Sequence, residues 1–590
     1  MMVIFSVKAS GARRWILSSA AVLSAGIVAV PALLPDSAAD LLPTGAVARA
    51  AANTEVTPSD LAGRIDPGAQ LSRAREYMER QRVEQQLEEN RKKQDTKVET
   101  EGQKPEQAEK QIRFQVNKIE TDPSEILTEG EISRITETYV GKTVSLQDLY
   151  DVADAISKLY EEKGYSICKA YLPPQRIHGG VVRINLLEGK TGNVTLDGLR
   201  FTRPSYVTNR IRLEPGKVAN TDRLNEQLQR FNATNDVQLR VLVHAGEKPG
   251  TTDYEIAALE PKTNQSVSLY VDNNGYETSG RWREGIFYPN RSLTGQRDDL
   301  RFNYLRSEGT HVVGLNYSMP VNEQGTMLDF DFGANRTKVT RGDLSNYGMI
   351  GHSWVAGFTL RHPLRTDQKR RDEIGFQFLY QDSETDFGSN IGHRQNVVDD
   401  SRYSFSPYIS FTHYGKSSVL YHKHSLAYNR FSNKVGTGDN YPVYKLDVIY
   451  QKQLGGGQML SGRFNAQVAS ESKTISPSDK FYIGGSGSVR GYEESFLAGN
   501  QGFSASLSYL APLDKKRIFN AFTFVDYGRV FGDERTTVDQ TLVSTGVGLT
   551  VNYKNFYSNL TLGIPLKREF KSRTDKVDRT RIHFNCSVTF

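Results

Sequence analysis

From residue 265 to its end, the 590-residue chain is a series of short stretches in which apolar and polar residues alternate. Leu328, Phe330 and Phe332, for example, alternate with two aspartates. Such a period of two is typical of β-strands with one apolar and one polar face. At about 20 residues for each strand with its connection, the segments suit membrane-crossing strands of about 9 to 11 residues. Sixteen segments can be counted, and they begin near residues 267, 282, 299, 311, 327, 353, 373, 403, 418, 443, 458, 501, 520, 542, 556 and 581.

The connections between these segments alternate in length. Those after even-numbered segments are short, as at 413–416 and 454–457, whereas those after odd-numbered segments are often long, as at 381–402 and 567–580. Bacterial barrels have tight periplasmic turns and longer external loops, while a soluble β-sandwich gives no reason for this alternation. We therefore expect a transmembrane β-barrel of 16 antiparallel strands over residues 265–590. The 29 Tyr and 27 Phe residues are enough for aromatic girdles at the membrane interfaces.

A helical membrane protein is not expected, because the mean hydropathy is -0.52 and a spanning helix needs about 20 mostly apolar residues. Only the stretch from Trp15 to Leu34 is long and apolar enough, and it follows three basic residues. We interpret residues 1–50 as a signal peptide that is cleaved after Ala39 or Ala50. An uncleaved anchor is the alternative, although two prolines weaken it.

Composition excludes several classes of function. The net charge of +6 could suggest nucleic acid, but basic and acidic residues are intermixed and no recognition motif is present, so no nucleic-acid partner is expected. Cys168 and Cys586 are far apart, which predicts neither a disulfide framework nor a metal site. The alternation of the last strand makes Cys586 a lipid-facing residue rather than a reactive thiol. We found no catalytic residues and no cofactor site, so the protein is not expected to be an enzyme.

The region before the barrel contains a helix, a linker and two small units. Residues 66–93 are predicted to form a helix with almost no apolar face. Such a helix is either surrounded by solvent between other parts of the protein, partly disordered, or enclosed in polar surroundings. Residues 94–110 predict a flexible linker. Residues 111–189 show the order β-α-α-β-β, with a capping box at Thr128 and Glu131, and residues 190–262 repeat that order with a helix capped by Thr221.

One glycine-dense stretch, from Phe481 to Glu493, lies between the eleventh and twelfth expected strands. At about 30 residues this external loop is long enough to fold back into the barrel, and its glycines permit the positive φ angles of a tight path. A mobile surface loop is the other interpretation. Its spacing matches neither a phosphate-binding loop nor a nucleophile elbow. The residues that carry this motif are Gly484, Gly485, Val489, Arg490, Gly491 and Tyr492.

The thirteenth expected strand carries Phe524, Asp526 and Gly528. Strand alternation points Asp526 into the lumen. There it could pair with Arg490 through two charge-assisted hydrogen bonds, a geometry that lysine cannot reproduce. The alternative is that both charges are solvated separately in a polar lumen.

The Val489-Arg490-Gly491-Tyr492 tetrad and the pattern of Phe524, Asp526 and Gly528 resemble motifs of the outer-membrane transporters of two-partner (type V) secretion. The two small units look like tandem POTRA domains, and the resemblance covers about residues 66 to 590. It implies that loop and strand interact inside the pore, that the N-terminal helix plugs the barrel, and that the energy comes from the partner's folding outside the cell.

The resemblance also implies a location and partners. The barrel is expected in the bacterial outer membrane with its POTRA domains in the periplasm, where they bind an unfolded exoprotein. That exoprotein could be a haemolysin, an adhesin or a contact-dependent toxin. Outer-membrane lipid and the barrel-assembly machinery are further expected partners. An assembly or insertion factor of the same superfamily, a passive porin and an enzyme anchored to a barrel are the alternatives, and the oligomeric state stays open.

Overall fold

The computed structural model of the protein describes residues 64–92, 99–100, 113–367, 369–388, 395–434, 438–470, 473–531, 540–570 and 577–590. The predicted signal peptide over residues 1–50 lies outside the described residues, as does the predicted linker except for residues 99 and 100. In the described part of the chain, no helix combines the length and the apolar character needed to cross a bilayer.

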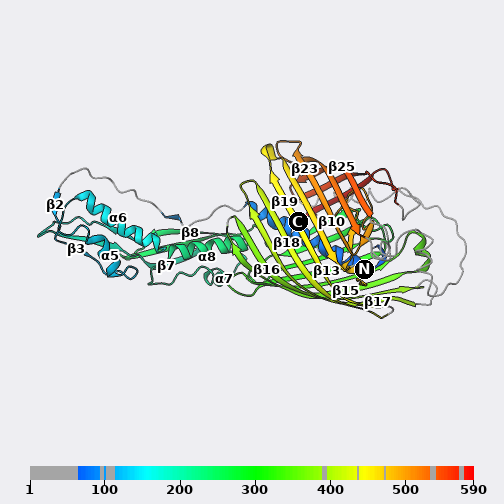
Figure 1. The fold of residues 1–590 in the computed structure, drawn as a ribbon, viewed down its shortest axis with the longest axis horizontal. Helices are drawn as coiled ribbons and strands as arrows, with labels where there is room; N and C mark the ends of the chain where they lie inside the picture. The colour runs from blue at the N-terminus through cyan, green and yellow to red at the C-terminus, as the bar shows by residue number, and fades with distance from the viewer. Residues whose placement is uncertain are drawn as a thin grey trace, which may run out of the picture. The chain divides into compact units, whose positions relative to one another are not determined.

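Sixteen antiparallel strands form one closed barrel, drawn in green to red in Figure 1. The first strand pairs with the last, with Ser268 opposite Thr589, and this pairing closes the barrel. The predicted sixteen-stranded barrel is therefore confirmed. The strands are β10 Ser268–Asp272, β11 Arg283–Asn290, β12 Asp299–Arg306, β13 Thr310–Pro320, β14 Met327–Lys338, β15 Ile350–Thr366, β16 Arg370–Phe387, β17 Gln395–Tyr414, β18 Ser418–Asn433, β19 Asn440–Gln453, β20 Met459–Ala469, β23 Gln501–Pro512, β24 Phe519–Phe531, β25 Gln540–Tyr553, β26 Phe556–Pro565 and β27 Arg581–Thr589.

One strand begins well before its predicted start. β17 begins at Gln395, whereas the alternation predicts a start near residue 403. The ladder between β16 and β17 continues to the pair Phe387 and Gln395. Residues 395–402 are mostly polar, so they carry no apolar alternation even though their backbone hydrogen bonds continue the sheet. Backbone pairing thus extends further than the apolar pattern that predicts it.

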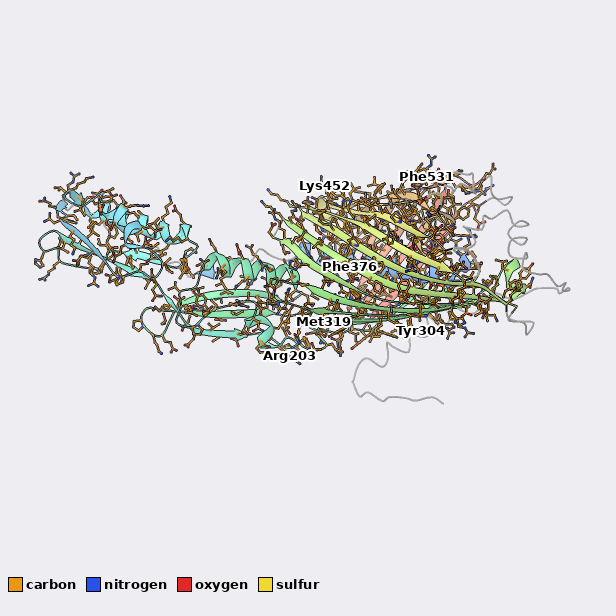
Figure 2. The ribbon with its side chains drawn as sticks, turned by 60° about the horizontal axis from the view of Figure 1, so that its bottom comes forward. Arg203, Tyr304, Met319, Phe376, Lys452 and Phe531 are labelled. Atoms are coloured by element: carbon orange, nitrogen blue, oxygen red, sulfur yellow. The ribbon has the colours of Figure 1, made fainter. Side chains whose placement is uncertain are left out.

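Alternation divides the wall into an apolar outer face and a polar inner face. On β24, the side chain of Val525 is 55% exposed, whereas that of Asp526 is fully buried. Phe376, labelled in Figure 2, is one of the large apolar residues of the outer face. Tyr380 and Tyr403 contribute an aromatic pair with ring centroids 4.7 Å apart. Such pairs are the material of an interfacial girdle.

In the described parts of the connections between barrel strands lie five short elements. They are η1 Asp343–Tyr347, η2 Gly455–Gly457, η3 Pro477–Asp479, β21 Phe481–Ile483 and β22 Leu497–Gly499. The last three belong to the glycine-dense connection between β20 and β23, where β21 pairs with β22 as a small two-stranded sheet.

The unit formed by residues 113–187 has a three-stranded sheet in the order β3-β6-β5 and a separate pair of β2 and β4. Two helices pack on it, and each begins with a capping box, at Thr128 and Glu131 and at Ser145 and Asp148. The buried core includes Val152, Ile156 and Tyr160. The elements are β2 Arg113–Gln115, β3 Lys118–Thr121, α5 Glu129–Thr136, β4 Thr143–Ser145, α6 Leu146–Glu162, β5 Lys169–Tyr171 and β6 Val181–Leu187.

The unit formed by residues 190–259 has a four-stranded sheet in the order β1-β8-β9-β7. Its edge strand β1 comes from the region of the predicted linker and pairs in parallel with β8. The side chain of Asn220, and not that of the predicted Thr221, caps α8, because it accepts the N–H of Arg223 at 2.9 Å. The elements are β1 Glu99–Thr100, β7 Lys190–Asp197, α7 Pro204–Thr208, α8 Thr221–Thr234, β8 Gln238–Ala245 and β9 Thr251–Leu259.

Both cysteines are free thiols. Cys168 is buried in the core of the unit formed by residues 113–187, and this burial raises the pKa of its thiol to about 12. His583 of β27 is buried on the inner face of the barrel. Cys586 is three positions further along the same strand and so has the opposite orientation. It therefore lies on the outer face, as the alternation predicts.

The polar helix predicted over residues 66–93 is α4, Pro67–Lys92, drawn in blue in Figure 1 among the strands of the barrel. Pro67 occupies its first position, where the missing N–H costs nothing. The carboxylate of Asp66 accepts the N–H of Ala69 at 2.6 Å and so caps the first turn.

Candidate functional site

The glycine-dense loop between β20 and β23 lies against the inside of the barrel wall. Gly484, Gly485 and Gly491 have φ angles of 107°, 93° and 94°, a region that side chains rarely permit. A Cβ atom on Gly491 would lie 3.1 Å from the backbone of Gly563 in β26. In turn, a Cβ atom on Gly563 would lie 2.5 Å from the backbone nitrogen of Gly491. Loop and wall therefore meet backbone against backbone, a contact that requires glycine on both sides.

Arg490 in this loop forms a bidentate ion pair with Asp526 of β24. Its Nε donates to Asp526 Oδ2 at 2.8 Å, its Nη2 donates to Oδ1 at 2.7 Å, and its backbone N–H donates to Oδ2 at 3.0 Å. Nη2 also donates to the hydroxyls of Ser506 and Ser508 at 3.0 and 3.1 Å. The guanidinium carbon lies 3.5 Å from the ring centroid of Phe524. Such a pair is stable in a buried place because both charges have partners.

Three further residues from the sequence motifs fix the loop beside this ion pair. The hydroxyl of Tyr492 lies within hydrogen-bond distance of the backbone carbonyls of Lys567, at 2.7 Å, and Val543, at 2.9 Å. Val489 is fully buried. A Cβ atom on Gly528 would lie 2.8 Å from Cγ2 of Val489, so the absence of a side chain at Gly528 provides the space for Val489. The structure thus places the loop residues and the wall residues that the sequence singled out next to one another.

The structure adds contacts to this site that the sequence did not single out. His583, on the inner face of the last strand, accepts the N–H of Gly491 through Nε2 at 3.1 Å. Ser506 also donates to Asp526 Oδ1 at 2.7 Å. The only sequence signal for either residue is a polar side chain at an inward-facing position, and many other positions of the barrel share it.

The helix α4 lies in the polar lumen, where its acidic side chains meet basic side chains of the wall. This polar housing explains how a helix with so narrow an apolar face can be stable. Three of the basic partners lie on the neighbouring strands β18, β19 and β20, and the fourth directly follows β11. The ion pairs are Glu76 with Lys445 of β19 at 2.7 Å, Glu79 with Lys423 of β18 at 2.7 Å, Glu84 with Arg463 of β20 at 2.8 Å, and Glu89 with Arg291 at 3.0 Å.

The arginines of α4 and of the residues just before it contact the glycine-dense loop. The guanidinium carbon of Arg73 lies 3.6 Å from the ring centroid of Tyr482. Arg80 donates through Nη1 to the carbonyl of Gly487 at 2.8 Å. Arg64 pairs with Glu493 at 3.2 Å. The helix therefore touches both the wall and the loop.

Apolar contacts between α4 and the wall are few. Leu71 and Leu87, two apolar residues of α4, are almost completely buried, with 1% and 3% of their surface exposed. Leu71 packs in one small cluster with Val312, Val355 and Leu379, and Leu87 packs in another with Val419 and Ile449. Ion pairs and hydrogen bonds therefore make up most of the contacts between α4 and its surroundings in the barrel.

Within the residues that the structure describes, no group of three or more His, Cys, Asp or Glu side chains is placed to hold a metal ion. Many polar side chains of the loop and the lumen form hydrogen bonds and ion pairs between parts of the chain. The arrangement is therefore suited to holding two elements, the loop and α4, inside the barrel.

Two family models match the sequence. A POTRA domain of the ShlB type matches residues 114–189, and the haemolysin secretion/activation protein model ShlB/FhaC/HecB matches residues 250–551. Among curated relatives, the heme/hemopexin transporter protein HuxB of Haemophilus influenzae is 26% identical over 496 residues, which cover 77% of this chain and 83% of that protein. The outer membrane transporter CdiB of Escherichia coli O6:K15:H31 is 22% identical over 489 residues, which cover 77% and 79%.

Two solved structures have the same fold. CdiB from Escherichia coli superposes with a TM-score of 0.63 at 18% identity, covering 91% of this chain and 99% of that chain. CdiB from Acinetobacter baumannii superposes with a TM-score of 0.61 at 18% identity, covering 89% and 100%. These structures support the barrel and the preceding α/β architecture.

Proposed function

Because the chain belongs to the haemolysin secretion/activation protein family ShlB/FhaC/HecB, whose members are outer-membrane transporters of two-partner secretion, we propose that it translocates an unfolded partner exoprotein to the cell surface. The protein is an outer-membrane β-barrel that carries a periplasmic POTRA domain of the ShlB type. In the proposal, the periplasmic part recognises the exoprotein and the barrel is its path across the membrane.

The observation that carries the proposal is how the lumen is closed. The helix α4 lies in the lumen and is held mainly by ion pairs, which water and mobile ions can replace. A passive porin needs an open aqueous channel, and α4 occupies that space. A pore that is closed by an exchangeable polar element suits a transporter that opens for its substrate.

The recognition step is proposed to use the edge of a sheet. Residues 190–262 are assigned as a second POTRA domain, because their main elements follow the same order as those of residues 111–189. Strand β8 is covered on its outer side only by the two-residue strand β1, whose Glu99 and Thr100 pair in parallel with Leu242 and Val243. The backbone groups of this edge can therefore pair with an extended segment, and such pairing is one of the recurring ways in which extended peptides are bound.

The loop is proposed to act as a fixed element of the pore. The pair of Arg490 and Asp526, with the glycines of loop and wall, would hold the loop to one side while an extended chain passes. The partner is proposed to be a large exoprotein such as a haemolysin, an adhesin or a contact-dependent toxin. No nucleotide-binding motif is evident in the sequence, and folding of the exoprotein outside the cell is the proposed source of energy.

The test starts by sequencing the neighbouring open reading frames for a large secreted β-helical protein and then measures secretion of that protein. We expect deletion of the gene for the transporter to remove that exoprotein from the medium and the cell surface, and a plasmid copy to restore it. If secretion persists while other barrels become depleted from the outer membrane, an assembly factor is the better assignment. If only the uptake of small solutes falls, the protein is a porin.

A further inference from the structure

A second buried ion pair fastens the glycine-dense loop to a different part of the wall. Asp479, the last residue of η3, lies N-terminal to the motif that contains Arg490, and its carboxylate accepts a hydrogen bond from Nη1 of Arg402 on β17. Both side chains are 7% exposed. Strands β18, β19, β20 and β23 separate β17 from β24, which carries Asp526. The loop is thus attached at two separated places on the barrel wall.

Other polar atoms of Asp479 also accept hydrogen bonds from neighbouring residues. Its Oδ2 accepts the hydroxyl of Tyr441 from β19 at 2.8 Å, and its backbone carbonyl accepts Nε2 of Gln467 from β20 at 2.6 Å. The Tyr441 oxygen in turn accepts the N–H of Ser476 at 2.9 Å. A buried carboxylate without such partners would be costly. Contacts from β17, β19 and β20 therefore hold Asp479 at a specific place on the wall.

The same site also holds the first turn of α4. Arg402 donates through Nη2 to Oε1 of Gln381 at 2.8 Å, and Gln381 donates through Nε2 to the hydroxyl of Ser478 at 3.0 Å. The helix approaches so closely that a Cβ atom on Gly68 would lie 2.3 Å from Ser383 Oγ and 2.8 Å from Ser478 Oγ. Gly68 therefore has no room for a side chain. Helix, loop and wall meet at one place.

We propose that Asp479 and Arg402 form a second anchor of the loop, and that this anchor positions the N-terminal turn of α4 and keeps the pore closed. If the anchor is lost, η3 is free to move away from β17, and the surface against which Gly68 packs moves with it. The inference rests on the part of the proposed function in which α4 closes the pore. It is independent of which exoprotein is secreted.

The experiment measures the open-channel frequency of the purified full-length protein in planar lipid bilayers. Asp479→Asn keeps the shape of the side chain but leaves Arg402 buried without a counter-charge. Because the loss of one partner of a buried ion pair shifts an equilibrium strongly, we expect open channels to become at least about tenfold more frequent. Arg402→Gln should act in the same direction.

The matched control is Lys473→Gln, which removes an ion pair in the same connection. Lys473 pairs with Asp439 at 3.1 Å, but these side chains are 46% and 28% exposed. Such an exposed pair contributes little, so the control should keep the wild-type opening frequency. If Asp479→Asn opens no more often than Lys473→Gln, the second anchor is refuted.

Barrel insertion is checked by heat-modifiable migration on gels, because a variant with a damaged barrel would not report on the plug. Should Asp479→Asn fail to insert, Gly68→Ala tests the same contact from the side of the helix and leaves the ion pair intact. Frequent opening of Gly68→Ala supports the anchor, and wild-type behaviour refutes it. A loss of secretion on gene deletion with unchanged conductance in both variants would leave the transporter assignment standing and remove only this inference.

Discussion

The loop and α4 share the lumen, but they are attached to it in different ways. The loop is held by buried, geometrically specific contacts, since the side chains of Arg490 and Asp526 are 14% and 0% exposed. The ion pairs of α4 are more open to water, with 30% and 49% exposure for Lys445 and Glu76. Buried, fully hydrogen-bonded pairs resist separation, whereas exposed pairs are worth about 0 to 1 kcal/mol. The comparison indicates that the loop is a fixed part of the pore and the helix a removable one.

The largest effect is expected from breaking the buried pair of the loop. Arg490→Ala leaves Asp526 buried without a counter-charge, a loss of about 3 to 5 kcal/mol for such pairs. We expect secretion of the exoprotein to fall by more than tenfold for Arg490→Ala and for Asp526→Ala, with the barrel still inserted. Quantification of the exoprotein in culture medium is the measurement.

A charge-swapped variant, Arg490→Asp with Asp526→Arg, would sharpen this prediction, because partial recovery would show direct contact. The matched control is Arg306→Gln, since the side chains of Arg306 and its partner Glu284 are each 58% exposed on the barrel. Normal secretion by Arg490→Ala would remove the proposed role of the loop.

Deletion of residues 66–93 is expected to have the next largest effect. Without α4 the lumen loses the element that fills it, so single-channel conductance in planar bilayers should rise several-fold while the loop stays attached. Arg490→Ala alone should raise conductance far less. A pore whose conductance is unchanged by the deletion would contradict the assignment of α4 as a plug.

A smaller effect is expected where loop and wall meet through glycine. In Gly563→Ala the new methyl group lies 2.5 Å from the nitrogen of Gly491, so the loop must shift. Such overpacking costs about 1 to 3 kcal/mol. We expect secretion to fall about threefold to tenfold. Gly462→Ala is the control, because its nearest contact would be 3.9 Å away and secretion should stay normal.

The smallest effect is expected from single ion pairs of α4. Glu79→Gln removes one pair with Lys423, in which the Glu79 side chain is 52% exposed, so the frequency of open channels should rise by only about twofold. In the wild type, raising the salt concentration from about 0.1 M to about 1 M shortens the Debye length from about 10 Å to about 3 Å and should open more channels. A response of the Glu79→Gln variant as large as that expected for Asp479→Asn would break the distinction between removable and fixed elements.

The barrel could be predicted from the sequence because its signal is local. Residues alternate along each strand because one face of the strand meets lipid and the other meets the polar lumen. This alternation placed Asp526 inside the barrel and Cys586 outside. The first residues of β17 were missed, because polar residues such as Asp399 and Asp400 continue the ladder without apolar alternation. Asn220 rather than Thr221 caps α8, since adjacent residues that both favour capping cannot be ranked without the backbone.

The candidate site could be predicted only where a motif marked it. Arg490 and Asp526 belong to recognisable patterns, whereas Arg402 and His583 are ordinary polar residues at inward-facing strand positions and Asp479 is an ordinary polar residue of the loop. Which of these residues meet depends on the path of the loop across the lumen, and that path is set by contacts between distant parts of the chain. The polar character of α4 left a polar housing as one of three possibilities, and it could not identify Lys423 or Lys445 as partners.

The narrow apolar face of α4 also determines what the helix would need after leaving the barrel. Leu71 and Leu87 are its two large apolar side chains that are nearly fully buried, and exposing them costs about 3 to 6 kcal/mol in total. The remaining surface is made mostly of charged and polar groups that water solvates well. Outside the barrel the segment would thus remain soluble without a chaperone or a membrane surface, and it could return to the lumen without first being released from an aggregate.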